Sequence, residues 1–482
     1  MKTSLAVLSK KGENAVPQIV AVLEALKAEN VCLGFATPSK FLEEEDFDRL
    51  RASKVDSQIA LGYAASTAFP RDEPQVIRLE NVTAIFDGTI YLPRQENSAL
   101  ETIALRLQGN CHDAAKGFVK DVEGDFSLII AKAEQIVAAR DPIGVQPLYY
   151  GENEALAALA SNRKTLWKLG VAEPKSFPPG NVAAITKNGF KFKAVKTLAY
   201  QTPKPITLQE GAEELQRLLE DSIQKRVFGV KKAAVAFSGG LDSSVVSFLA
   251  KKCGVEIQLM HVSLENQPET EEARKAAEEL QLPMQVHLFK EADIEEVIAS
   301  VVGLIEEPDP VKASVGVPFY WAAQKTAEAG LKVLLAGQGA DELFGGYQRY
   351  ITEFIAEGDE KVRQTMYGDV VNIHESNIER DEKICGFHDV ELCLPFASFE
   401  LAKFAMSLPT ELKFEKKQDS LRKLVLRKAA ENMGLSTQIT QKPKKAVQYS
   451  TGISRALKRI ARKKNLTITE YTATLFTESK KA

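Results

Sequence analysis

The second half of the chain switches repeatedly between two hydrophobic periodicities. Short apolar runs rich in small and β-branched residues are each followed by segments whose apolar residues recur at helical spacing. The runs at 233–237, 257–262, 284–288 and 333–336 predict strands, and 243–252, 269–280 and 318–329 predict helices. Strands that alternate with helices in this way indicate a doubly wound parallel sheet, in which ligands bind at the carboxyl ends of the strands.

The first 200 residues are richer in strand patterns. The runs 5–8, 83–91 and 124–130 predict strands, and 16–28 has the spacing of a helix. We expect the strand at 83–91 to turn as a hairpin at its Asp-Gly pair.

A stiff linker, Pro203-Lys204-Pro205, joins the two patterns. It precedes an amphipathic helix at 208–226, and beyond Gly346 the pattern predicts helices to the last residue. We therefore expect two domains, residues 1–200 and 201–482.

The strand at 233–237 runs directly into Ser238-Gly239-Gly240-Leu241-Asp242-Ser243-Ser244. A strand that breaks at two glycines and enters a helix presents backbone N–H groups to one point, which suits a phosphate. The loop lacks the lysine of a Walker A motif. Its carboxylate and hydroxyls fit a magnesium nucleotide, and the alternative is an ordinary turn with a capping carboxylate.

Composition and charge narrow the class of protein. With 482 residues, 44% hydrophobic and 26% charged, the chain has the composition of a soluble globular protein of two or three domains. A net charge of −3 gives no general attraction to nucleic acid or anionic membrane. Five scattered cysteines, no signal-peptide pattern and no apolar run near the ~20 residues of a membrane span lead us to expect a cytoplasmic enzyme.

Two motifs resemble the asparagine synthetase family. SGGLDSS at 238–244 resembles the pyrophosphate loop of N-type ATP pyrophosphatases, and GQGADELFGGY at 337–347 resembles the family's GEGSDELFGGY. Residues 138–150 and 177–180 resemble the class II glutaminase domain that precedes the synthetase half. The resemblance implies an N-terminal-nucleophile α/β/β/α sandwich followed by an ATP pyrophosphatase domain.

The resemblance also implies a two-step reaction at the second domain. A carboxylate attacks the α-phosphorus of ATP and releases pyrophosphate, and an amine then displaces AMP from the acyl-adenylate to form an amide. Asp242 and Asp341 would coordinate Mg²⁺ on the pyrophosphate. The nucleotide would contact Ala236, Ser238, Gly239, Gly240, Ser243, Ser244, Val262 and Gly337.

Residues 442–452 resemble the family segment that supplies a catalytic lysine. On this match Lys444 is the candidate for the catalytic lysine, and Lys445 is the second choice. The alternative is a solvated basic loop. We expect the basic cluster at 455–464 to lie on a solvent-facing helix rather than in an RNA-binding patch. We expect His261 to be a strand residue packed in the protein rather than a catalyst.

The first domain departs from the family where glutaminase chemistry takes place. Lys2 stands at the position of the nucleophilic cysteine, and the family's NGE turn is here Asp87-Gly88-Thr89. The RGPD loop has no counterpart near 28–36. We expect a glutaminase fold without glutaminase activity, with Thr3 or Cys32 as the alternative nucleophile.

The second domain departs from the family at its substrate end. Gln338 replaces a glutamate, so general-base work would fall to Glu342, Glu391 or solvent. Cys393 and Ser398 replace an arginine and an aspartate of the family.

Three hypotheses follow for the function. The first is amidation of aspartate by ammonia, with no nucleic-acid or membrane partner and a possible homodimer. The second is ligation of another carboxylate and amine, as in β-lactam synthetases. The third is a non-catalytic ATP-binding regulatory protein, and a tRNA-modifying adenylating enzyme is a weaker alternative.

Overall fold

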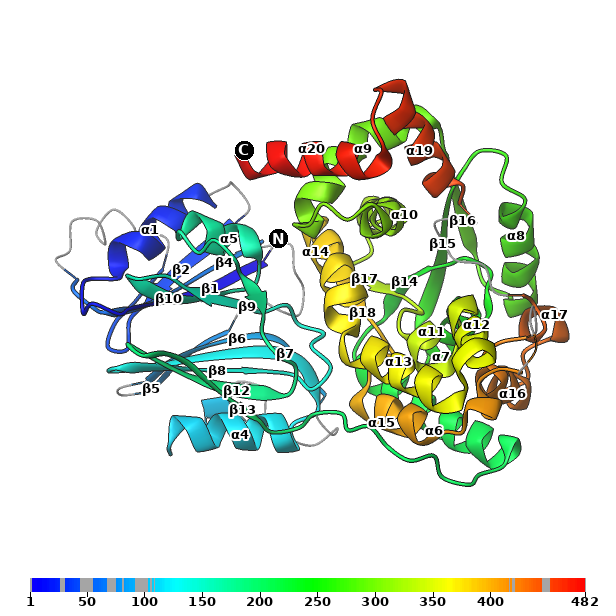
Figure 1. The fold of residues 1–482 in the computed structure, drawn as a ribbon, viewed down its shortest axis with the longest axis horizontal. Helices are drawn as coiled ribbons and strands as arrows, with labels where there is room; N and C mark the ends of the chain where they lie inside the picture. The colour runs from blue at the N-terminus through cyan, green and yellow to red at the C-terminus, as the bar shows by residue number, and fades with distance from the viewer. Residues whose placement is uncertain are drawn as a thin grey trace. The chain divides into compact units, whose positions relative to one another are not determined.

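The computed structural model describes residues 2–26, 31–43, 55–66, 75–79, 82–91, 103–104, 106–107, 109–415, 417, 421–443 and 451–481. The chain divides into two compact units, Met1–Thr197 and Leu198–Ala482 (Figure 1). In the described parts of the chain, no helix is long and apolar enough to cross a membrane.

The first unit consists of two stacked sheets between helices. Its described strands are β1 (Lys2–Ser9), β2 (Val31–Ala36), β3 (Phe41–Glu43), β4 (Ile59–Ser66), β5 (Gln75–Leu79), β6 (Val82–Ile90), β7 (Gly124–Lys132), β8 (Gln135–Arg140), β9 (Tyr149–Glu152), β10 (Leu156–Ala160), β11 (Lys175–Ser176), β12 (Asn181–Thr186) and β13 (Gly189–Ala194).

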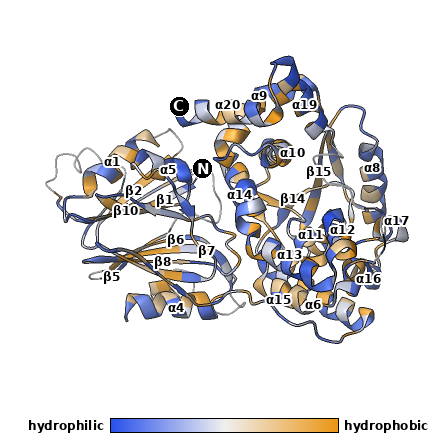
Figure 2. Ribbon diagram, viewed as in Figure 1, coloured by the Kyte–Doolittle hydropathy of each residue, from blue (hydrophilic) through white to orange (hydrophobic). Residues whose placement is uncertain are grey.

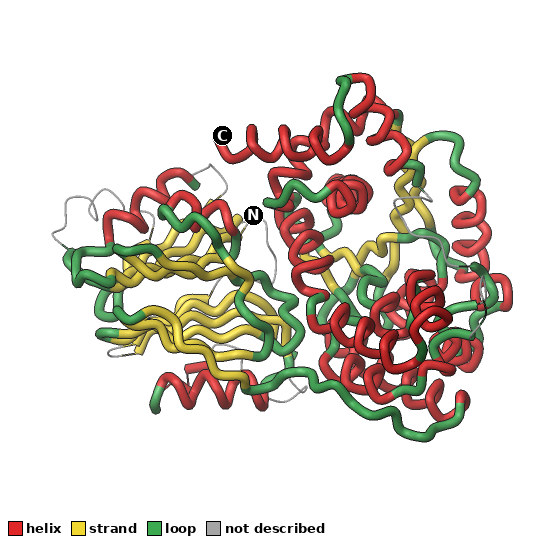
Figure 3. Tube along the Cα trace, viewed as in Figure 1, coloured by secondary structure: helices red, strands yellow, loops and turns green. Residues whose placement is uncertain are grey.

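These strands form one sheet of order β11-β9-β10-β1-β4-β2-β3 and another of order β13-β12-β8-β7-β6-β5. Helices α1 (Val16–Ala25) and α5 (Arg163–Lys168) cover the first sheet, and α4 (Cys111–Asp121) covers the second. Figure 3 shows the two layers of strands between these helices. The predicted α/β/β/α sandwich is confirmed.

The sequence of β1 shows why the sheets stack. Leu5 and Val7 belong to the core between this sheet and α1, whereas Ala6 and Leu8 belong to the core between the two sheets. Successive side chains of a strand point to opposite faces, so the run 5–8, which is buried on both faces, is apolar at every position. Helix α4 is apolar on one side only (Figure 2), and its Phe118 ring packs 4.9 Å from that of Phe126.

The predicted hairpin within 83–91 is wrong. Strand β6 runs through Asp87 and Gly88 without a turn and pairs with β7 along its whole length, Asp87 opposite Ser127 and Gly88 opposite Phe126. Gly88 has φ of 125°, which glycine adopts without strain. Pairing with β7 therefore outweighs the local turn signal of Asp-Gly.

The second unit is built on a sheet of order β16-β15-β14-β17-β18. Its strands are β14 (Lys232–Ala236), β15 (Glu256–Leu264), β16 (Met284–Phe289), β17 (Val333–Leu335) and β18 (Glu391–Cys393). All neighbouring pairs are parallel, which confirms the doubly wound sheet. The direction of winding reverses between β14 and β17, so the loops that follow these two strands open on the same crevice.

Helices surround this sheet and fill the rest of the unit (Figure 1). Those in the described residues are α6 (Leu208–Arg226), α7 (Leu241–Lys252), α8 (Glu269–Leu280), α9 (Glu291–Ile305), α10 (Pro310–Glu328), α11 (Ala340–Phe344), α12 (Gln348–Glu357), α13 (Asp359–Val371), the π-helical segment η2 (His374–Ile378), α14 (Glu379–Phe387), α15 (Phe399–Ser407), the 3₁₀ turn η3 (Thr410–Leu412), α16 (Leu424–Asn432), α17 (Thr437–Thr440), α19 (Ile453–Lys463) and α20 (Ile468–Lys481).

Two predictions for this unit need correction. Helix α10 begins at Pro310, where Asp309 accepts hydrogen bonds from the backbone N–H groups of Val311 and Lys312, so Pro318 lies inside the helix and does not begin it. The region after Gly346 was predicted to be helical throughout, but β18 adds a strand to the sheet beside β17. Three residues carry little periodicity, and only tertiary pairing defines this strand.

Candidate active site

The loops after β14 and β17 line one cavity of about 570 Å³ in the second unit. Most of the predicted site residues contribute to its wall: Ala236, Ser238, Gly240, Asp242, Ser243, Val262, Gly337, Gln338, Asp341 and Glu342. Three others do not line it. Gly239 packs its Cα against Ala273 of α8, Ser244 is fully buried, and Glu391 begins β18 at the amino end of that strand.

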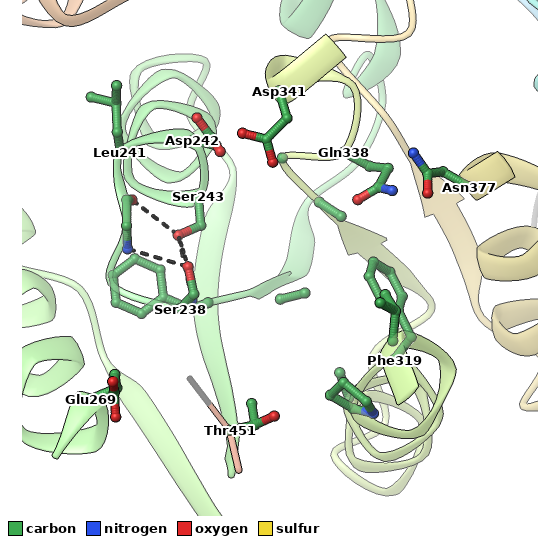
Figure 4. A pocket seen from close by; sticks show the side chains of 18 of the residues that line it. Ser238, Leu241, Asp242, Ser243, Glu269, Phe319, Gln338, Asp341, Asn377 and Thr451 are labelled. Carbon is green, nitrogen blue, oxygen red and sulfur yellow. Dashed lines mark hydrogen bonds between the residues drawn. The ribbon is translucent and has the colours of Figure 1, made fainter. Parts of the chain in front are cut away.

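The loop after β14 is held by its own hydroxyl groups. Ser238 Oγ and Ser243 Oγ lie 3.3 Å apart, the Gly240 N–H donates to Ser238 Oγ at 3.3 Å, and Ser243 Oγ donates to the Gly240 carbonyl at 3.2 Å (Figure 4). Gly239 has φ of 66°, and a Cβ there would lie 2.6 Å from the Cα of Ala273, so the turn needs a residue without a Cβ. The first turn of α7 thus opens into the cavity with its backbone N–H groups, as an anion site requires.

The two motifs touch each other. A Cβ on Gly337 would lie 2.7 Å from Asp242 Cβ, so only glycine allows the second motif to approach α7 this closely. Figure 4 shows the carboxylates of Asp242 and Asp341 turned toward one another from α7 and α11. The sequence predicted both residues as metal ligands, and the fold places them side by side.

A lysine that the sequence analysis did not identify lies between these carboxylates. Lys423 Nζ donates to Asp242 Oδ1 at 2.7 Å and to Asp242 Oδ2 at 2.6 Å, and lies 2.7 Å from Asp341 Oδ1. Its side chain is 2% exposed. Burial alone would lower the pKa of Lys423, but the charges and hydrogen bonds of the two aspartates outweigh burial and raise it. No local motif marks this lysine, which follows Asp242 by 181 positions.

The backbone of Lys423 is in the left-handed region, with φ of 61° and ψ of 42°, at the N-cap of α16. This conformation is uncommon for residues other than glycine and asparagine, and such strain is concentrated at functional sites. Hydrogen bonds fix it: the Leu424 N–H donates to the Lys413 carbonyl at 3.0 Å, and the Arg427 N–H to the Lys423 carbonyl at 2.9 Å.

The donor set at this point fits Mg²⁺. Two carboxylates converge on one position beside a phosphate-type loop, and Mg²⁺ is commonly held by one or two carboxylates together with substrate phosphates. Within the described ranges, no group of three or more His, Cys, Asp or Glu side chains could hold a metal. Phosphate oxygens of a bound nucleotide would complete the coordination of an ion held by Asp242 and Asp341.

A buried acid, Glu342, lies beside the pair of carboxylates formed by Asp242 and Asp341. Glu342 is 3% exposed, and its Oε1 accepts hydrogen bonds from Tyr347 Oη at 2.5 Å and from Asn377 Nδ2 at 2.6 Å. Burial and the neighbouring Asp341 charge raise the pKa of Glu342. Asn377 comes from η2, and π-helical segments often occur at functional sites. Gln338, on the same wall, carries no charge.

Charged side chains continue along this end of the cavity. Arg380 forms two hydrogen bonds to the buried Asp381, at 2.7 and 2.9 Å. Arg349 Nη2 donates to Asp369 Oδ2 at 2.7 Å, and its guanidinium lies over the Tyr347 ring. This wall therefore offers both signs of charge to a small polar ligand.

The opposite end of the cavity is formed by β15. Val262 and His261 line it, and His261 is buried with Nδ1 2.9 Å from the Phe237 carbonyl and Nε2 3.2 Å from Thr270 Oγ1. Burial lowers the pKa of His261, so the ring stays neutral at physiological pH. These contacts agree with the expected packing role of His261.

The predicted catalytic residues Lys444 and Lys445 lie outside the described residues. The residues on either side of their segment are placed at the cavity. Lys442 Nζ donates to the Gly239 carbonyl at 3.1 Å and lies 3.1 Å from Glu272 Oε2, and the Leu264 N–H donates to the Thr451 carbonyl. Arg427 holds the same segment through the carbonyls of Thr440 and Lys442.

Three of the six basic residues at 455–464 pair with acids of α9. Arg459 and Lys463 both pair with Glu291, at 2.7 and 2.9 Å, and Lys464 lies 3.4 Å from Glu295. The basic side chains at 455–464 are exposed, so this face of α19 is turned to solvent, as expected.

In the first unit, Lys2 begins β1 and its Nζ lies 3.6 Å from Oδ1 of the buried Asp87. An ion pair thus joins the position of the expected nucleophile to that of the NGE turn. The alternative nucleophiles are both strand residues: Thr3 is fully buried in β1, and Cys32 of β2 is paired with Ala65.

Comparison with known proteins agrees with both halves of this description. Residues 214–357 and 355–476 match the family described as asparagine synthase, and 71–168 match the glutamine amidotransferase domain. The solved structure of glutamine phosphoribosylpyrophosphate amidotransferase from B. subtilis is 13% identical, with a TM-score of 0.34, over 59% of this chain and 80% of that one.

Two curated relatives are similar over most of the chain. A protein of Methanocaldococcus jannaschii, provisionally named asparagine synthetase (glutamine-hydrolyzing) 1, is 31% identical over 72% of this chain and 72% of its own. The asparagine synthetase (glutamine-hydrolyzing) of Asparagus officinalis is 27% identical over 79% of this chain and 68% of its own. With both motifs at one cavity and a family match over more than half of its length, the chain belongs to the asparagine synthetase family.

Proposed function

We propose that the protein is an ATP-dependent ligase that activates aspartate as β-aspartyl-AMP and amidates it with ammonia. The convergence of Asp242 and Asp341 beside the Ser238–Ser243 loop is the observation that carries this proposal. It provides the anion cradle and the cation ligands that binding of a nucleoside triphosphate requires.

In the first step, the loop and the start of α7 would hold the β- and γ-phosphates of ATP while the β-carboxylate of aspartate attacks the α-phosphorus. The nucleotide base would lie against Ala236 and Val262, at the other end of the cavity. Mg²⁺ bound by Asp242 and Asp341 would neutralise the leaving pyrophosphate. Lys444 would stabilise the negative charge that develops on the phosphoryl and acyl oxygens.

In the second step, ammonia attacks the acyl carbon and AMP leaves. The attacking nitrogen must lose a proton, and Gln338 cannot accept one. Glu342 can, because it lies in the cavity wall and burial raises its pKa toward the operating pH. The mixed charges near Arg380 suit the amino and carboxylate groups of an amino acid.

The source of nitrogen is the third part of the proposal. The relatives' names describe glutamine hydrolysis, but here a lysine stands at the nucleophile position and pairs with Asp87. An ammonium group held by a buried carboxylate cannot attack an amide as a thiolate does. Free ammonia, or ammonia from a separate protein, would therefore be the nitrogen donor.

Pyrophosphate release from Mg–ATP tests the proposal. The full chain is assayed with and without aspartate, with ammonium or glutamine, and the product is identified by chromatography. Release that needs aspartate and ammonium, with asparagine as product, supports the proposal. ATP binding without aspartate-dependent release contradicts it, and a screen of other carboxylates then tests the β-lactam synthetase-like alternative.

A further inference from the structure

The point between Asp242 and Asp341 is already filled by a charge of this chain. Lys423 Nζ lies within 2.7 Å of both carboxylates, and its side chain is 2% exposed. Magnesium–oxygen bonds are ~2.1 Å long, so an ion bound to both carboxylates would need the space that the ammonium group takes.

The surrounding residues are shaped to keep Lys423 there. A methyl group on Gly346 would overlap both Asp341 Oδ1 and Lys423 Cε. The Gly346 carbonyl accepts a hydrogen bond from Arg422 Nη1 at 2.9 Å, which holds this glycine against the residue that precedes Lys423. Together with the left-handed backbone of Lys423, these contacts direct the ammonium group into the pair of aspartates.

We propose that Lys423 is a built-in counter-ion that keeps free Mg²⁺ out of the site, so that the metal enters only together with the triphosphate. The proposal rests on the proposed binding of Mg–ATP at this cavity. It adds that Mg²⁺ binds there only when the triphosphate is bound too.

The charges at this site explain why Mg²⁺ binds with the triphosphate and not alone. Two carboxylates and one ammonium leave a single net negative charge, and an ammonium tethered to the same chain competes with a dissolved ion at high effective concentration. Displacing it would also leave a buried ammonium without its partners, which is costly. A triphosphate changes this balance because it brings several negative charges, which can pair with Lys423 and complete the coordination of Mg²⁺ at the same time.

Isothermal titration calorimetry tests the proposal by measuring how tightly the full chain binds Mg²⁺ in the absence of aspartate. Three proteins are compared: wild type, Lys423→Met, and Lys383→Met as the control. Lys383 also pairs with a buried carboxylate, 3.0 Å from Glu306 Oε2, but it does not line the cavity.

We expect wild type and Lys383→Met to bind free Mg²⁺ weakly, and Lys423→Met to bind it at least about tenfold more tightly. Adding Asp341→Asn to Lys423→Met should abolish the gain. Equal affinity of wild type and Lys423→Met for free Mg²⁺ would overturn the proposal.

A second measurement needs only the wild-type protein, in case Lys423→Met does not fold. Mg²⁺ is titrated into the protein with and without α,β-methylene-ATP, and the heat of Mg²⁺ binding to the analogue in buffer is subtracted. We expect saturable binding to the protein only with the analogue. Tight binding of Mg²⁺ alone would refute the role of Lys423. Failure of the analogue to bind would refute the proposed function instead.

Discussion

The hydroxyl of Tyr347 donates a hydrogen bond of 2.5 Å to Glu342 Oε1 inside the cavity. Asn377 Nδ2 donates to the same oxygen at 2.6 Å. Two donors on one oxygen fix the direction of the carboxyl group and leave Oε2 for another partner. A fixed acid with a raised pKa at the end of a ligand cavity has the features of a general base.

Glu342→Gln is expected to separate the two steps of the reaction. Aspartate-dependent exchange of pyrophosphate into ATP should persist, because it needs no base, whereas amide formation should fall about 10²-fold. Radiolabelled pyrophosphate exchange and asparagine formation measure the two steps. Tyr347→Phe removes one hydrogen-bond donor but keeps the carboxyl group of Glu342, so its rate of amide formation should fall much less. An equal loss of both steps would mean that Glu342 only supports the site.

Lys444→Ala should lower aspartate-dependent pyrophosphate release by about 10²- to 10³-fold, the usual effect of removing one group that stabilises transition-state charge. ATP binding, measured by calorimetry, should change by a few-fold at most. Lys445→Ala is the matched control and should retain most of the activity. If Lys445→Ala is inactive and Lys444→Ala is active, Lys445 is the catalytic lysine and the assignment of Lys444 is wrong.

Glutamine should not replace ammonium. The pure protein is expected to form asparagine with ammonium chloride and to release no glutamate from glutamine, because Lys2 pairs with Asp87 at the nucleophile position. Coupled detection of glutamate with glutamate dehydrogenase measures this directly. Glutamate release by the pure protein would show that another residue of the first unit acts as nucleophile.

Gly346→Ala should destabilise the second unit and weaken ATP binding, because the added methyl group would overlap Asp341 and Lys423. Overpacking of this kind costs about 1–3 kcal/mol in the free energy of unfolding. Urea denaturation with and without Mg–ATP measures both effects. Gly368→Ala in α13 is the control: a Cβ there meets no atom within 4 Å, so stability should be kept or improved.

Lys413 should make stability depend on pH in the alkaline range. Burial, assisted by Arg363, lowers the pKa of Lys413 to about 7, whereas an unfolded lysine has a pKa of about 10.4. Between these values the unfolded chain binds more protons, so this group makes the free energy of unfolding rise with pH from 7 toward 10. The burial penalty is fully present below pH 7.

Lys413→Met removes the titrating group and should make the protein more stable at pH 7, while the gain fades toward pH 10. Urea midpoints of both proteins at several pH values provide the measurement. An equal difference between the two proteins at every pH would show that Lys413 titrates normally in the folded state.

The sequence was sufficient for the features that depend on local chemistry. The strand and glycine turn at 233–244 specify a phosphate-type loop, because a strand that breaks at two glycines and enters a helix presents its backbone N–H groups to one point. Alternating strands and helices predict the parallel sheet, and the carboxyl-end rule then places Asp242 and Asp341 near each other. The apolar run at 5–8 predicts a strand, and β1 contains it.

Tertiary structure decided what depends on partners far along the chain. Asp87-Gly88 has the local signal of a turn, but pairing with β7 on both sides of this dipeptide keeps β6 in the sheet. Lys423 has no recognisable motif, because its role comes from two aspartates brought to it by separate strands and from a strained backbone held by Lys413 and Arg427. Local sequence sets the conformation of a turn, whereas long-range packing determines which charges meet in a buried site.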